Sequence, residues 1–248
     1  MAGEGAPVVL LHQTPRSWDE YRDVLGLLAR SRRAIAMDTP GYGDSTPLSA
    51  SEDSVERWAE VVVSLLDALE IERAALVGHH TGSYVAAEVA VAWPDRVSAV
   101  VLSSMAIAPA QERLQHSRGP AVVDEVEPAA DGAHVLELWR LRAPMYPPGT
   151  ELLERYLIDC LKAGPRAAEG HRVVARYASE ERVGEIRCPA LLLGATDDPH
   201  AYPALGRLQE AIPHARTVEI EGGMVPLPDQ LPAEFAHAVG SFLDDVDA

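Results

Sequence analysis

The stretch from Ala74 to Val91 reads A-A-L-V-G-H-H-T-G-S-Y-V-A-A-E-V-A-V. Its first four residues are apolar and predict a short buried strand, and its alanine- and valine-rich second half predicts a helix. Gly78 and Gly82 bracket the turn between them, and such glycines permit a sharp strand-to-helix turn that pushes the middle side chain into a cavity. In the G-x-S-x-G form of this turn the middle residue is a nucleophilic serine, whereas here it is His80. We therefore expect the function to depend on what a histidine does there.

Short apolar runs alternate with amphipathic helical patterns along both ends of the chain. Besides the run at 74–77, the predicted strands are residues 7–11, 34–37, 97–102, 190–193 and 217–220. The predicted helices cover residues 18–28, 55–69, 202–211 and 232–243, and Ser54 is the expected N-cap of the second. Continuous apolar strands are typical of sheets that are covered on both faces. The alternation therefore predicts an α/β fold with a doubly wound, mostly parallel sheet.

This alternation stops after Ser104. From there to residue 185, prolines at positions 109, 120, 128, 144, 147, 148 and 165 separate short helical patterns, such as the one that contains Trp139. We interpret residues 105–185 as a helical insertion rather than a second independent core. The core then consists of residues 1–104 and 186–248.

Composition and charge exclude several classes of protein. With 248 residues, of which 47% are hydrophobic and 24% charged, the chain is long enough to bury one large core. Its formal net charge of −17 excludes nucleic acid and anionic membranes as expected partners. The N-terminus lacks the pattern of a signal peptide, and no apolar run is long enough to span a bilayer. Cys160 and Cys188 are too few for a disulfide framework, so we expect a cytoplasmic protein.

Cofactors and metals are not expected. The glycines at 41, 43 and 82 lack the G-x-G-x-x-G spacing of a dinucleotide site. The histidines outside the elbow show no metal-ligand spacing. The expected partner is a small-molecule substrate, and an exposed edge strand would allow a homodimer.

Four landmarks make the chain resemble the α/β-hydrolase superfamily over nearly its full length. In the family's order they are an H-G-x-P-like loop at residues 12–15 with Gln13 in place of the glycine, a D-x-x-G-x-G-x-S loop at 38–45, the elbow at 78–82, and the strand at 191–197 that delivers the acidic triad member. The resemblance implies that residues 105–185 form the helical cap, which roofs the substrate pocket. It also implies that the loop at Gln13 helps to form an oxyanion hole.

The chain departs from the family at the position of the general base. A G-G-H turn normally supplies the histidine that activates the serine, but this chain has Gly222-Gly223-Met224. A thioether cannot take a proton from a hydroxyl at neutral pH. With His80 at the serine position and Met224 at the base position, the usual seryl acyl-enzyme cannot form. In addition, only six residues precede Pro7, where the family usually has a hairpin. We therefore expect a smaller sheet of about six strands, with the strand at 34–37 near one edge.

Proton transfer is the chemistry that remains. An imidazole pushed into a pocket can act as a general acid or base, so His80 is the first catalytic candidate. His12 is the second, although in the superfamily this position is commonly structural. Asp197, with Asp198 as its rival, is the expected partner of a pocket histidine. An oxyanion or enolate could be stabilised by the amide of Thr81 and by an amide near Gln13.

Trp139 and Met224 complete the expected substrate-binding residues, together with Gln13 and Thr81. These features favour an atypical enzyme with the α/β-hydrolase fold that acts on a small apolar carbonyl compound, such as an ester, a lactone or a polyketide-like molecule. Histidine acid–base chemistry suits elimination, decarboxylation, isomerisation, cyclisation or water-mediated hydrolysis. The alternative is a catalytically silent protein that binds a small ligand.

Overall fold

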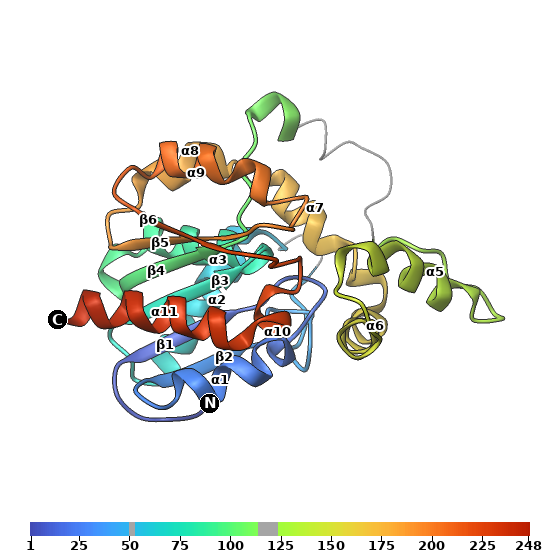
Figure 1. The fold of residues 1–248 in the computed structure, drawn as a ribbon, viewed down its shortest axis with the longest axis horizontal. Helices are drawn as coiled ribbons and strands as arrows, with labels where there is room; N and C mark the ends of the chain where they lie inside the picture. Colours follow the sequence, from blue (N-terminus) through green and yellow to red (C-terminus); the bar gives the residue numbers. More distant parts are fainter. Residues whose placement is uncertain (50–52, 114–123) are drawn as a thin grey trace.

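The core of the protein is one parallel sheet. The computed structural model describes residues 1–49, 53–113 and 124–248, and its strands are ordered β2-β1-β3-β4-β5-β6 (Figure 1). The strands are β1 (Pro7–Leu11), β2 (Arg33–Met37), β3 (Ala74–His79), β4 (Val97–Ser103), β5 (Ala190–Ala195) and β6 (Arg216–Ile220). The predicted fold class is confirmed, and β2 is an edge strand as expected. Ala2 adds only an isolated antiparallel bridge to Ala34.

Helices cover both faces of this sheet, and further helices belong to the insertion. The helices are α1 (Arg22–Leu28), α2 (Val55–Ala68), α3 (Thr81–Ala92), α5 (Ala133–Arg142), α6 (Glu151–Ala163), α7 (Glu169–Arg176), α8 (Ser179–Arg182), α9 (Leu205–Ala211), α10 (Leu227–Gln230) and α11 (Pro232–Asp247). On one face, α1 and α11 pack against the sheet through residues such as Val24 and Phe235. On the other face, α2, α3 and α9 bury residues such as Trp58 and Leu208. Among the described residues, no helix is both long and apolar enough to cross a bilayer.

The insertion forms a helical projection on one side of the sheet (Figure 1). Helices α5 and α6 pack around a small cluster of their own that includes Leu138 and Tyr156. Helix α7 returns to the core, where Val173 joins the cluster beneath α2 and α3. Gly170 allows this close approach, because a Cβ atom there would lie 2.1 Å from Oγ1 of Thr14. Residues 114–123 of the predicted insertion lie outside the described residues.

A fully buried arginine joins the insertion to the core. Arg16 follows β1, and its side chain is 0% exposed. Its guanidinium donates to the carbonyl oxygen of Arg155 on α6 at 3.0 Å, contacts the carboxylate of Asp159 on the same helix, and donates to Asp229 of α10 at 2.8 Å. A buried charge needs such partners, since desolvation without them is costly. Arg16 therefore ties the cap to both the loop after β1 and the C-terminal layer.

Candidate active site

The turn after β3 has the strained geometry of a nucleophile elbow. His80 has φ 45° and ψ −115°, which is the left-handed region that side chains other than glycine rarely adopt. A Cβ atom at Gly78 would lie 2.3 Å from the carbonyl oxygen of Gly82, and one at Gly82 would lie 1.9 Å from that of Leu11. Only glycine fits at either position. Ser83 closes the turn by donating its hydroxyl to the carbonyl oxygen of Gly78 at 2.8 Å.

His80 contacts a buried carboxylate directly. Its Nε2 atom lies 2.9 Å from Oδ2 of Asp198, whose side chain is 0% exposed. The other oxygen of Asp198 accepts the backbone N–H groups of His200 and Ala201 at 2.9 and 3.1 Å. Burial alone would raise the pKa of Asp198, but His80 and these two amides outweigh it and hold that pKa well below its usual range. Asp198 is therefore an anion beside the imidazole.

Asp197, the first acidic candidate, is exposed and points elsewhere. Its backbone N–H donates to Gly223 at 2.8 Å, and its carboxylate accepts the hydroxyl of Thr196 at 3.3 Å. The carboxylate that contacts the elbow histidine is thus Asp198 rather than Asp197. Both residues follow the same strand, so the sequence alone left the choice between them open.

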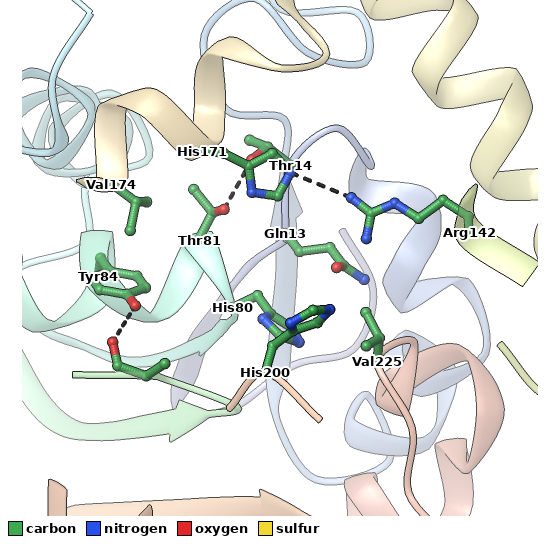
Figure 2. A pocket seen from close by; sticks show the side chains of 11 residues that line it. Gln13, Thr14, His80, Thr81, Tyr84, Arg142, His171, Val174, His200 and Val225 are labelled. Atoms are coloured by element: carbon green, nitrogen blue, oxygen red, sulfur yellow. Dashed lines mark hydrogen bonds between the residues drawn. The ribbon is translucent and has the colours of Figure 1, made fainter. Parts of the chain in front are cut away.

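A cavity of about 250 Å³ lies over the elbow, between the core and the cap (Figure 2). It is lined by Gln13, Thr14, His80, Thr81, Tyr84, Ala106, Arg142, His171, Val174, His200 and Val225. Two of the predicted substrate-binding residues, Gln13 and Thr81, are among these. Trp139 instead packs against the cluster inside the cap. Met224 does not belong to this lining, although its neighbour Val225 does.

His12 and His79 lie behind the cavity wall and are held by the surrounding protein. Nδ1 of His12 donates to the carbonyl oxygen of Gln13 at 2.8 Å, and its Nε2 accepts the N–H of Thr39 at 2.9 Å. His79 likewise donates from Nε2 to the carbonyl oxygen of Val225 at 2.8 Å. Burial lowers the pKa of His12 to about 4 and that of His79 to about 3. Both rings are neutral, and the geometry gives each a structural role.

Two threonine hydroxyls face each other in the cavity lining, beside the elbow. Oγ1 of Thr14 lies 2.9 Å from Oγ1 of Thr81, so one of them donates to the other (Figure 2). Thr81 is also the first residue of α3, where backbone N–H groups have no partner within the helix. The amide of Gln13, in contrast, donates to the buried carboxylate of Glu20 at 2.9 Å. The backbone N–H of Gln13 is thus already used, whereas Thr14 and Thr81 both line the cavity.

The cap contributes polar groups that the sequence did not single out. Arg142 at the end of α5 and His171 on α7 both contact Asp124, whose side chain is 0% exposed. His200 lines the cavity from the core side. Arg142, Asp124 and His171 are far apart in the chain and share no spacing, so only the folded cap brings them together. Among the described residues, no cluster of three or more His, Cys, Asp or Glu side chains has the arrangement of a metal site.

Comparison with known proteins agrees with the fold. Residues 8–238 match the model of the "Alpha/beta hydrolase family". A 2-hydroxymuconate semialdehyde hydrolase from Pseudomonas sp. is 37% identical over 108 residues, which are 42% of this chain and 38% of that protein. An (E)-2-((N-methylformamido)methylene)succinate hydrolase from Acinetobacter baylyi is 25% identical over 204 residues, which are 80% of this chain and 75% of that protein. The chain thus spans well under half of the first relative.

Solved structures extend the likeness to the whole chain. MenH from S. aureus superposes with a TM-score of 0.84 at 17% identity, covering 100% of this chain and 98% of that one. A thermophilic esterase from Thermogutta terrifontis superposes with a TM-score of 0.82 at 22% identity, covering 100% and 92%. At such identities the likeness concerns the fold alone.

Proposed function

Since the chain belongs to the alpha/beta hydrolase family, we propose that it is an enzyme that hydrolyses a small carbonyl compound, such as an ester or a lactone, with His80 as its general base. The observation that carries this proposal is the 2.9 Å contact between Nε2 of His80 and the buried carboxylate of Asp198. In this arrangement the elbow histidine meets the acidic residue directly, and no second histidine stands between them.

In this proposal His80 is the general base, and Asp198 orients its ring. The anionic carboxylate favours the tautomer with its proton on Nε2, which leaves Nδ1 free to take a proton from water. The resulting hydroxide adds to the carbonyl carbon of the substrate. Asp198 then stabilises the imidazolium, and His80 returns the proton to the leaving oxygen as the bond from carbon to that oxygen breaks. Water and substrate together yield a carboxylic acid and an alcohol or enol.

Thr81 and Thr14 would stabilise the oxyanion that forms during this addition. If Thr14 donates to Thr81, the hydroxyl of Thr81 is free to donate to the substrate, next to its own backbone N–H. Both relatives named above are hydrolases by name, which favours hydrolysis over elimination, decarboxylation or cyclisation.

Paired carboxamide variants test the proposal. His80→Asn and Asp198→Asn should each lower kcat/KM on p-nitrophenyl esters and enol lactones by about 10²–10⁴-fold, the usual contribution of general-base catalysis. Asp197→Asn is the matched control, because it removes the same charge from the exposed neighbour and should leave kcat/KM nearly unchanged. A fluorophosphonate probe should label no serine.

Three results would contradict the proposal. The first is an equal loss of activity in Asp197→Asn and Asp198→Asn, and the second is stoichiometric labelling of a serine. The third is wild-type protein that binds such esters but never turns them over, which would favour the silent ligand-binding alternative.

A further inference from the structure

We propose that Arg142 forms a binding subsite for a carboxylate group on the substrate, at the cap side of the cavity. The inference deepens the proposed function by naming a substrate class, a small carbonyl compound that carries a carboxylate. The anion-binding step itself does not depend on turnover.

Arg142 is held rigidly and has one nitrogen left over. Its Nε donates to Oδ1 of Asp124 at 2.7 Å and to the hydroxyl of Tyr156 at 3.1 Å, while Nη2 contacts the other oxygen of Asp124. Among the described residues, the acceptor offered to Nη1 is the sulfur of Met145, 3.7 Å away. A thioether is a weak acceptor, so a buried guanidinium nitrogen keeps unused donor capacity. Arg142 is only 4% exposed, yet it lines the cavity.

The charged side chain among the described lining residues of the cavity is a cation, Arg142. The lining also contains the three histidines His80, His171 and His200, and the described lining residues include no aspartate or glutamate (Figure 2). The chain has a formal net charge of −17, so a lining with one cation and no carboxylate departs from the charge of the protein as a whole. Asp124 lies behind the wall, where Arg142 and His171 use its oxygens. Such complementarity selects an anionic ligand.

The remaining contacts favour a carboxylate of modest size. Met145 lies between the two groups that would hold it, because its sulfur is also 3.3 Å from Nε2 of His200. An anion that displaced this thioether would meet donors from both Arg142 and His200. The apolar side chains of Val174 and Val225 also line the cavity and suit a short carbon chain. A cavity of about 250 Å³ accommodates a small molecule of this kind.

The test is equilibrium binding of benzoate and of benzamide, which have the same shape but differ in charge. By calorimetric titration, the wild-type protein should bind benzoate about ten- to a hundredfold more tightly than benzamide. Arg142→Gln should abolish this preference. Arg140→Gln, on the same helix but exposed, changes the net charge equally and should keep it. Methylphosphonate, as a second anion, should bind more weakly than benzoate, which has an apolar ring for the valines.

Two further variants keep the test decisive. Arg142→Gln leaves Asp124 buried without its main partner, so the double variant Asp124→Asn/Arg142→Gln repeats the measurement without that carboxylate. Equal binding of benzoate and benzamide to the wild type would overturn the proposal, as would a preference that survives in a folded Arg142 variant. His80→Asn should retain the preference. If it does while no ester is hydrolysed by the wild type, the subsite stands and the proposed function fails.

Discussion

His80 takes the place of the elbow serine and itself contacts the acidic residue, so no separate histidine lies between the elbow and that carboxylate. Its backbone occupies the serine position of the elbow, and its ring reaches Asp198 at the end of β5. An imidazole is long enough to make this contact, whereas a serine hydroxyl is not. The methionine at 224 is therefore consistent with the histidine at 80, because a second imidazole on that turn would compete for the same carboxylate.

The hydroxyl of Thr81 provides a prediction at this scale. Thr81→Val retains the shape and the backbone N–H but removes the donor, and it should lower kcat by up to about 10²-fold with little change in KM. Thr81→Ser retains the hydroxyl and should remain close to the wild type. Steady-state kinetics on the best ester substrate separate the two variants. Equal activities would exclude the hydroxyl as an oxyanion donor.

Single residues differed in how far the sequence could predict them. His80 was predictable because glycines on both sides of it leave one backbone geometry, and that geometry exposes the side chain. The choice between Asp197 and Asp198 was not, because the turn after β5 decides which of them points inward. Arg142 and His171 were out of reach, since their meeting at Asp124 depends on how the cap helices pack.

Helix α7 sets the distance between the cap and the loop after β1, which contains Thr14. Gly170 lies directly against the side chain of Thr14, whose hydroxyl contacts Thr81. The next residue, His171, faces the cavity. The position of one helix backbone thus affects both the pair of threonine hydroxyls and part of the cap wall.

Gly170→Ala should therefore impair activity more than it impairs folding. The added methyl group would meet Oγ1 of Thr14 at 2.1 Å, so α7 or Thr14 must shift. A displacement of about 1 Å at such a site can cost about 10²-fold in rate, and we expect a loss of that order in kcat/KM. Gly206→Ala on α9 is the control, because its Cβ would meet nothing within 4 Å. A Gly170→Ala enzyme with full activity would show that the helix has room to move.

The core elements were more predictable than those of the cap. Strands such as β1 and β4 are nearly continuous apolar runs, because both faces of the sheet are covered. Helix α2 began at its predicted N-cap, where the hydroxyl of Ser54 accepts the N–H of Arg57. The cap helices bury only a small cluster, so their apolar pattern is short and their order in space cannot be inferred from it.

The stability of the whole molecule depends on pH through two buried neutral histidines, His12 and His79. In the unfolded chain a histidine has a pKa near 6.5, whereas in the folded protein that of His79 is about 3. Between these values the unfolded state binds the extra proton, so this residue's contribution to the free energy of unfolding falls as the pH falls below 6.5. For His79 the loss should be about 2 kcal/mol between pH 7.5 and pH 5.

The measurement compares urea unfolding of the wild type and of His79→Asn at both pH values. Burial raises the pKa of Glu20 to about 8 and that of Asp229 to about 6, so these two groups stabilise the folded state more as the pH falls. Both proteins contain them, so their contribution cancels in the difference between the wild type and His79→Asn. The free energy of unfolding of the wild type should exceed that of His79→Asn by less at pH 5 than at pH 7.5. The surface variant His237→Asn should follow the wild type at both values. An advantage that does not change with pH would mean that His79 is protonated in the folded state.

Arg16 has a consequence for how the protein folds as a unit. Its guanidinium lies where the loop after β1, the cap helix α6 and the short helix α10 meet, with no exposed surface. Lifting the cap away would break the contacts of Arg16 with the carbonyl oxygen of Arg155 and with Asp159 on α6, and would leave only Asp229 of the core beside it among these partners. Cap and core therefore form one cooperative unit. We therefore expect the cap not to fold separately from the core. A movement of the cap that admits substrate should keep the contacts of Arg16 and rotate the cap about this residue.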